Sequence, residues 1–143
     1  GIRVSELCAL RWRDLQPRGN AGQMTVWGKG GKERVILLPQ SVWEELIDLG
    51  GRVVPERPVF ETRGRRPLHA TQVRRIVRRA CRRTGVSVPV SPHWFRHAHA
   101  SHALDRGASL ALVRDTLGHR SVATTGKYLH ARPNDSSSCY LAL

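Results

Sequence analysis

The segment His93-Trp94-Phe95-Arg96-His97 is followed by Leu117-Gly118-His119 and, nine residues after His119, by Tyr128 in Thr124-Thr125-Gly126-Lys127-Tyr128. These three short segments decide how the chain is interpreted. Arginine is charged at any working pH and binds the nonbridging oxygens of a phosphodiester. Histidine transfers protons, and a tyrosine oxygen can act as a nucleophile. The pattern therefore predicts chemistry at a phosphodiester carried out by side chains alone.

Two further candidate groups lie earlier in the chain. Arg3 stands in Gly1-Ile2-Arg3-Val4-Ser5-Glu6-Leu7, and Lys29 stands in Gly28-Lys29-Gly30-Gly31-Lys32. Taken singly, Arg3 is typical of a surface or ion-paired arginine, Lys29 of an exposed turn residue, and Tyr128 of a half-buried helix aromatic. Only their occurrence together, in this order, favours a functional site.

The composition points to a polyanionic partner. The chain has 143 residues, with 24 Lys and Arg against 11 Asp and Glu, so its formal net charge is +13. Only three of the cationic residues are lysines. Hydrophobic residues make up 40% of the chain, too many for a disordered basic tail. A charge of this size without a lipid-facing stripe or lipidation signal favours nucleic acid over a membrane surface.

Several other classes of protein are excluded by what the sequence lacks. It contains no run of 18 apolar residues and no leading apolar segment, so we expect neither a membrane span nor a signal peptide. Cys8, Cys81 and Cys139 lie far apart, which argues against a disulfide framework or a cysteine zinc site. His93 and His97 are four residues apart, but no acidic or cysteine third ligand stands near them, so we expect no metal. These observations predict a soluble, cytoplasmic protein.

The expected elements define an α+β fold that is mostly helical. Strands at 24–27 and 34–38 should form an antiparallel hairpin with a basic tip, with 59–60 a candidate third strand. We expect helices at 1–10, 41–49, 71–84, 93–106, 110–117 and 122–130. Large aromatic side chains should lie in the core, namely Trp12, Trp27, Trp43, Trp94 and Phe95.

One helix is unusually rich in arginine. Residues 62–104 contain ten arginines and no acidic residue, and most of these arginines occupy one face of the helix at 71–84. Like-charged pairs four apart cost roughly 0.2–0.5 kcal/mol each. A merely solvated face would normally mix signs, so we expect this face to meet DNA phosphates, with a bland solubilising surface as the alternative. The predicted DNA-binding residues are Arg63, Arg65, Arg66, Arg74, Arg75, Arg78, Arg79, Arg82 and Arg83.

The order and spacing of the candidate groups resemble the catalytic domain of the tyrosine recombinases, also called phage integrases. The groups are, in chain order, Arg3, Lys29, His93, Arg96, His119 and Tyr128. The resemblance implies the integrase-like, DNA breaking-rejoining fold over residues 1–132, with 133–143 as a C-terminal tail. It implies a site-specific DNA recombinase that cleaves and rejoins strands through a 3′-phosphotyrosyl intermediate, without metal or other cofactor. The implied partners are double-stranded DNA and, in the full-length protein, further copies forming a tetramer.

The resemblance also implies a role for each group. Tyr128 would attack the scissile phosphate while the 5′-hydroxyl leaves. Arg3 and Arg96 would together hold the nonbridging oxygens, a task suited to two guanidinium forks. Lys29 would protonate the 5′-oxygen.

Three supporting roles follow from the same resemblance. His93 would transfer the proton of the tyrosine, and His119 would hydrogen-bond the phosphate or pack the site. Glu6 would orient Arg3 without touching the substrate.

The chain differs from the family pattern at its start. Members carry a preceding DNA-clamping domain and at least one more helix, so we expect an N-terminally truncated catalytic domain with apolar surface uncovered near Leu7 and Leu10. Two alternatives stay open. One is a basic DNA-binding module or degenerate integrase fragment that does not cut DNA. The other is a metal-free RNA-cleaving enzyme built on His93, Lys29 and His119.

Overall fold

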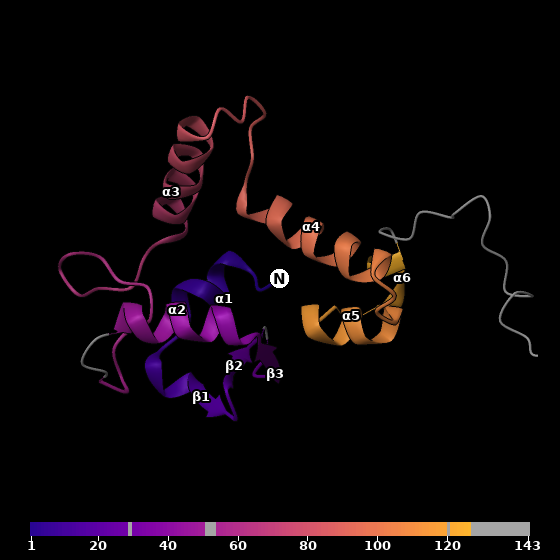
Figure 1. The fold of residues 1–143 in the computed structure, drawn as a ribbon, viewed down its shortest axis with the longest axis horizontal. Coiled ribbons are helices and arrows are strands. Elements are labelled where there is room, and N and C mark those ends of the chain that lie inside the picture. The colour runs from indigo at the N-terminus through magenta and orange to yellow at the C-terminus, as the bar shows by residue number, and fades with distance from the viewer. Residues whose placement is uncertain (29, 51–53, 120, 127–143) are drawn as a thin grey trace, which may run out of the picture.

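The computed structural model describes residues 1–28, 30–50, 54–119 and 121–126. It combines a small antiparallel sheet with helices, as expected, and the elements follow one another as Figure 1 shows. They are α1 (Val4–Ala9), the 3-10 turn η1 (Trp12–Asp14), β1 (Leu15–Arg18), β2 (Ala21–Trp27), β3 (Glu33–Leu38), α2 (Gln40–Gly50), α3 (Ala70–Arg83), α4 (Pro92–Asp105), α5 (Leu110–Leu117) and α6 (Val122–Gly126).

The sheet has three antiparallel strands in the order β1-β2-β3. The predicted hairpin is present as β2 and β3, with Met24 paired to Ile36. The third strand, however, is Leu15–Arg18 and not residues 59–60, which lie in a bend beside an isolated bridge at Pro58. Pro17 is typical of a turn, but β1 is an edge strand, where a missing N–H costs no ladder bond.

A first core joins the inner face of the sheet to α2 and to residues on either side of α1. Burial alternates along β2, so that Met24 and Val26 point inward and Trp27 lies 57% exposed. Trp12 is buried as expected, and Trp43 packs against the core from α2. The buried members of this core are Leu10, Trp12, Leu15, Met24, Val26, Leu38 and Val59.

Two expectations about this part of the chain were wrong. Leu10 is only 4% exposed, because Val59 and the sheet residues cover it, whereas Leu7 is partly exposed. Trp27 is exposed because the last position of β2 falls on the outer face of the sheet.

A second, smaller core lies between α4 and α5. It consists of Ala100, Val113 and Leu117, with Ala103 and Leu104 packed against it. The predicted boundaries of α5 are confirmed. The Ser109 Oγ accepts the Leu112 N–H at 3.2 Å, and Gly118 ends the helix in the left-handed conformation with φ of 64°.

Trp94 and Phe95 were expected in this core, but they are 53% and 57% exposed. The inward face of α4 is formed by Arg96 and Ala100. At 100° per residue, position 94 lies nearly opposite position 96 on the helix, and position 95 lies to one side. Small alanines, not the aromatic residues, therefore face α5.

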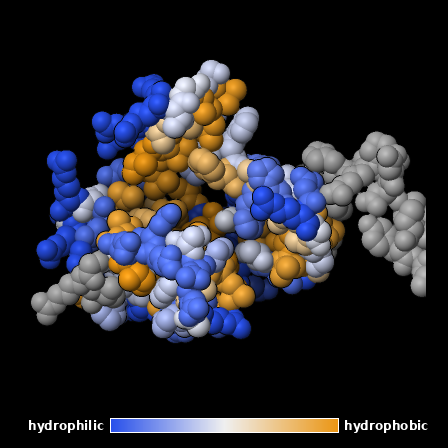
Figure 2. Space-filling model, viewed as in Figure 1, coloured by the Kyte–Doolittle hydropathy of each residue, from blue (hydrophilic) through white to orange (hydrophobic). Residues whose placement is uncertain are grey.

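Helix α3 stands apart from the sheet in Figure 1. Its bounds match the predicted helix within one residue, but none of its residues is buried, and Ile76 is 54% exposed. Figure 2 shows hydrophobic side chains along this helix next to a hollow, and hydrophilic ones on its outer side. No helix in the described part of the chain is long and apolar enough to cross a membrane.

Candidate active site

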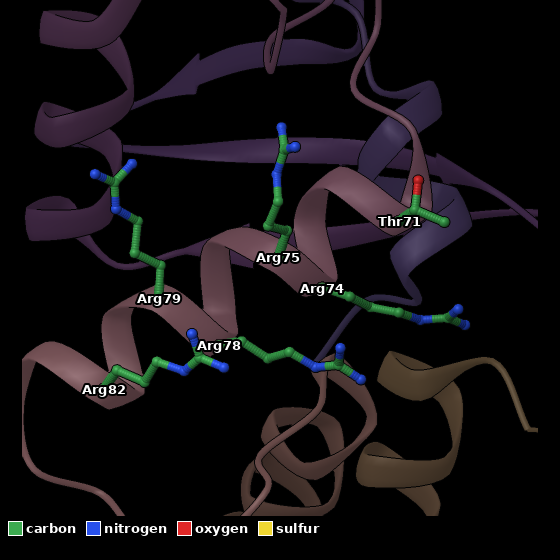
Figure 3. Close-up of a pocket in the computed structure, with 6 residues that line it drawn as sticks. All are labelled: Thr71, Arg74, Arg75, Arg78, Arg79 and Arg82. Carbon is green, nitrogen blue, oxygen red and sulfur yellow. The ribbon is translucent and has the colours of Figure 1, made fainter.

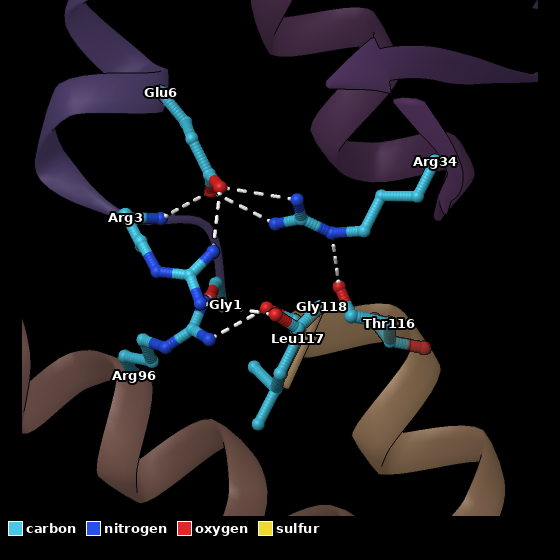
Figure 4. Close-up of polar contacts among 8 residues, drawn as sticks. All are labelled: Gly1, Arg3, Glu6, Arg34, Arg96, Thr116, Leu117 and Gly118. Carbon is cyan, nitrogen blue, oxygen red and sulfur yellow. Dashed lines mark hydrogen bonds and ion pairs between the residues drawn. The ribbon is translucent and has the colours of Figure 1, made fainter. Parts of the chain in front are cut away.

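Three arginines from three separate elements meet the C-terminal end of α5 (Figure 4). The last carbonyls of a helix have no partner within it and carry the negative end of its dipole, so guanidinium groups suit them. Each of three successive carbonyls accepts from a different arginine: Arg34 Nε to Thr116 O at 2.8 Å, Arg96 Nη2 to Leu117 O at 2.6 Å, and Arg3 Nη2 to Gly118 O at 3.0 Å. We call this set of contacts the arginine clasp.

A single carboxylate connects two members of the clasp. Oε1 of Glu6 accepts from Arg3 Nη1 at 2.8 Å and Arg34 Nη1 at 3.0 Å. Its Oε2 accepts the backbone N–H of Arg3 at 2.7 Å and Arg34 Nη2 at 2.8 Å. The Glu6 side chain is 4% exposed. Burial works to raise its pKa, but the hydrogen bonds from Arg34 and Arg3 outweigh burial and lower the pKa to about 2.

The guanidinium groups of Arg3 and Arg96 thus donate to adjacent carbonyls, those of Gly118 and Leu117. Arg96 is buried, and its Nη1 also donates to the Gly1 carbonyl at 2.6 Å. The Arg3 side chain is 41% exposed. The structure therefore brings together the two arginines that the sequence predicted to act as a pair.

His119 is the next residue after Gly118, whose carbonyl accepts from Arg3 in the clasp. Its Nδ1 lies 2.9 Å from the hydroxyl of Thr125, which is fully buried in α6. Burial lowers the pKa of the imidazole, and the charges of Arg96, Arg3 and Arg34 lower it further. A lowered pKa favours the neutral ring, which has one donor and one acceptor nitrogen.

His93 lies in the first turn of α4, three residues before Arg96. Its ring is exposed and makes an edge-to-face contact with His97, with ring centres 4.2 Å apart. Burial, followed by the charges of His93 and Arg96, lowers the pKa of His97. Within the described residues, no group of His, Cys, Asp and Glu could hold a metal ion.

Lys29 and Tyr128 lie outside the described residues, so the structure does not place them relative to the clasp. Their neighbours are placed. The N–H of Gly28 donates to the Lys32 carbonyl at 2.7 Å across the hairpin loop, and Gly126 ends α6 two residues before Tyr128.

The predicted DNA-binding arginines are all exposed. A pocket on α3 is lined by Thr71, Arg74, Arg75, Arg78, Arg79 and Arg82. Figure 3 shows Arg75 and Arg79 extending to one side of the helix and Arg74 and Arg78 to another. The remaining ones are Arg83 at the end of α3 and Arg63, Arg65 and Arg66 in the loop before it. None of these arginines is among the three that form the clasp.

Sequence reasoning missed Arg34, which it assigned only to a strand. The folded sheet explains its partners: β3 pairs Arg34 with Val26, which is only 2% exposed, and a charged residue in register with a buried one needs an ionic partner. The sequence alone carried no signal for this pairing.

The sheet and the helices together form the fold of the tyrosine recombinases of known structure. The chain belongs to the phage integrase family, whose family model matches residues 1–135.

Two relatives are tyrosine recombinases called XerC. The one from Xanthomonas campestris pv. campestris (strain B100) is 38% identical over 136 residues, which cover 91% of this chain and 40% of the relative. The one from Corynebacterium glutamicum is 41% identical over 135 residues, 91% of this chain and 42% of the relative. The chain therefore spans less than half the length of these relatives.

Solved structures of recombinases also match this chain. A crystal structure of XerA recombinase matches with a TM-score of 0.77 and 28% identity, over 92% of this chain and 48% of the other. The XerH site-specific recombinase bound to its difH substrate matches with a TM-score of 0.77 and 23% identity, over 92% and 40%; this second match is a likeness of fold.

Proposed function

We propose that residues 1–132 are the catalytic domain of a site-specific recombinase that cleaves and rejoins DNA strands through a 3′-phosphotyrosyl intermediate. Membership of the phage integrase family supports this proposal. The observation that carries it is the convergence of Arg3 and Arg96 on adjacent carbonyls beside His119. A guanidinium has five N–H donors, so it can be held by protein acceptors and still bind an oxyanion.

In the proposed reaction, the phenol oxygen of Tyr128 attacks the phosphorus of the scissile phosphate, and the bond to the 5′-oxygen breaks. Lys29 gives that oxygen a proton, and His93 takes the proton of the phenol. Arg3 and Arg96 stabilise the charge that gathers on the nonbridging oxygens, where preorganised donors have their largest effect. His119, neutral and beside the clasp, donates a further hydrogen bond. Rejoining reverses these steps, so no metal, nucleotide or other cofactor is needed.

The arginines of α3 are the proposed contact with double-stranded DNA. Their exposure and the absence of acidic residues from positions 62–104 support this assignment. Solved structures of similar fold include the XerH recombinase bound to its difH substrate and the Tn1549 transposon integrase in complex with transposon DNA. Assembly of the full-length protein into a tetramer on DNA is part of the same proposal.

A trapping experiment tests the function. The chain is incubated with duplexes of randomised sequence that carry a nick near the position to be cut, so that the released 5′-end diffuses away and rejoining is blocked. We expect a covalent protein–DNA adduct with its nucleotide on the Tyr128 peptide. Tyr128→Phe should abolish the adduct while DNA affinity changes little, and Tyr140→Phe is the matched control.

The other outcomes identify the alternatives. Binding without any adduct would indicate a DNA-binding module. Cleavage that requires a 2′-hydroxyl would indicate the RNA-cleaving enzyme. An adduct on Tyr140, or one that survives Tyr128→Phe, would contradict the assigned nucleophile.

A further inference from the structure

Arg34 is a largely buried cation to which the proposed reaction gives no role. Its side chain is 13% exposed, although it lies on β3, an edge strand of the sheet. All three of its guanidinium nitrogens donate to protein acceptors: Nη1 and Nη2 to the two oxygens of Glu6, and Nε to the Thr116 carbonyl. A guanidinium bound in this way is held in one position.

The two residues that accept hydrogen bonds from Arg34 are Glu6 and Thr116, and both belong to elements that also bind Arg3 or Arg96. Glu6 also binds the backbone and side chain of Arg3. Thr116 lies in the last turn of α5, which supplies carbonyls to Arg96 and Arg3 and leads into His119. Arg34 therefore connects the sheet to both supports of the predicted arginine pair.

The packing at Gly118 shows how closely Arg34 lies against this turn. A Cβ added to Gly118 would meet Arg34 Nη1 at 3.1 Å and its Cζ at 3.2 Å. The guanidinium thus covers the backbone just before His119, and its removal would leave that turn without its neighbour.

Removal of Arg34 would also change the electrostatics of the clasp. Glu6 would keep its buried position and its negative charge, with Arg3 as its one remaining partner among the described residues. A buried carboxylate that loses a charged partner becomes harder to ionise. A Glu6 side chain that is neutral part of the time would hold the guanidinium of Arg3 less firmly.

We propose that Arg34 is a positioning residue for strand cleavage: it fixes the Glu6 carboxylate and the last turn of α5, and so holds Arg3 in place without contacting the scissile phosphate. This inference rests on the proposed function. Three of its five N–H donors are already bound to protein acceptors, and the salt dependence of binding tests whether the other two contact the phosphate.

The test compares Arg34→Gln and Arg34→Lys with Arg18→Gln, which removes the same charge from an exposed position of β1. Single-turnover cleavage of the trapped duplexes should fall about 10- to 100-fold in Arg34→Gln, because misplacement of a catalytic group has effects of this size. Arg34→Lys should recover little, since lysine lacks the fork that spans both carboxylate oxygens. Arg18→Gln should cleave like the unsubstituted chain.

Two further measurements separate positioning from other roles. The slope of log affinity against log salt should stay unchanged, whereas a variant that binds one phosphate fewer would have a slope smaller by about 0.9. In a Glu6→Gln background, Arg34→Gln should add little further loss of rate, because both substitutions break the same link. A reduced slope, or losses that multiply, would overturn the proposal.

Nuclear magnetic resonance gives a readout that does not depend on cleavage. In Arg34→Gln, the carboxyl carbon of Glu6 should titrate at a higher pH, and the guanidinium signals of Arg3 should show faster rotation. Unchanged signals in a folded variant would overturn the proposal. Should Arg34→Gln not fold, Arg34→Lys supplies the same comparison. If the unsubstituted chain forms no adduct, the proposed function fails, while these signals still decide whether Arg34 positions Arg3.

Discussion

Arg3 and Arg96 donate to the carbonyls of Gly118 and Leu117, so one turn of backbone sets the positions of both guanidinium groups. If both groups bind one phosphate, they act as a unit, and their effects on rate should be strongly non-additive. We predict that Arg3→Ala or Arg96→Ala alone lowers single-turnover cleavage by about 100-fold or more. The double variant should lose little further.

Because Arg96 is buried, its replacement also leaves carbonyls without a donor, so each variant is first checked for folding by circular dichroism. Arg96→Lys keeps the charge but not the planar fork, and it should still be impaired. Losses from the two single variants that multiply in the double variant would show that the arginines serve different sites.

For single residues, the sequence predicted which side chains form the site better than it predicted their burial and their contacts. The resemblance of the motifs around Arg3, Arg96 and His119 to the tyrosine recombinases predicted that these residues lie in one site. Local patterns could not reveal Arg34 or the exposure of Trp94, because both depend on which neighbour packs against the residue after folding. An arginine in a strand looks the same in sequence whether it meets water or a carboxylate.

The last turn of α5 ends at Gly118 with φ of 64°, a conformation that costs an L-residue roughly 1–2 kcal/mol. An added Cβ there would also press on Arg34 at 3.1 Å. We predict that Gly118→Ala destabilises the fold by more than this backbone cost and lowers the cleavage rate. Chemical denaturation and single-turnover cleavage measure the two effects.

Gly85, which follows the end of α3, is the matched control. Its φ is 73°, and a Cβ there would meet no atom of the described residues within 4 Å. Gly85→Ala should show the backbone cost alone and leave cleavage unchanged. Equal effects of the two substitutions would show that the packing of Arg34 against Gly118 contributes nothing to stability or to the cleavage rate.

Helix α3 carries its arginines on an exposed surface, and none of them is among the three that form the clasp. We predict that Arg75→Glu with Arg79→Glu weakens DNA binding and flattens its salt dependence by about 0.9 for each phosphate that the variant no longer binds. Fluorescence anisotropy at several salt concentrations measures the slope. Arg18→Glu reverses a charge on the sheet and should leave the slope unchanged. An unchanged slope in the α3 variant would place the DNA-binding surface elsewhere.

The elements themselves were largely predictable from local signals. Ser109 and Gly118 mark the ends of α5, and Pro92 begins α4. The strand β1 was missed because Pro17 normally argues against a strand, and only its edge position makes it acceptable. Edge position depends on how the sheet is assembled, so local sequence cannot supply it.

Over the whole molecule, the clasp lies between two separate hydrophobic cores. One core is on the sheet side, and the other lies between α4 and α5. In Figure 1 the N-terminus lies between these two groups of elements. Glu6 and Arg34 come from the sheet side, while the carbonyls that bind the arginines come from α5. Ionic and hydrogen-bonded interactions therefore couple the cores, and their strength should depend on pH.

The sign of that dependence follows from Glu6, whose pKa is lowered from 4.5 to about 2 in the folded chain. The resulting stabilisation is complete above pH 4.5 and is lost as the pH falls toward 2, up to about 3 kcal/mol in total. We predict that Glu6→Gln is less stable at neutral pH and loses this part of the acid dependence. Hydrogen exchange should show α5 and the end of α4 losing protection before the sheet does. A variant whose stability falls with acid as steeply as that of the unsubstituted chain would show that Glu6 does not couple the two cores.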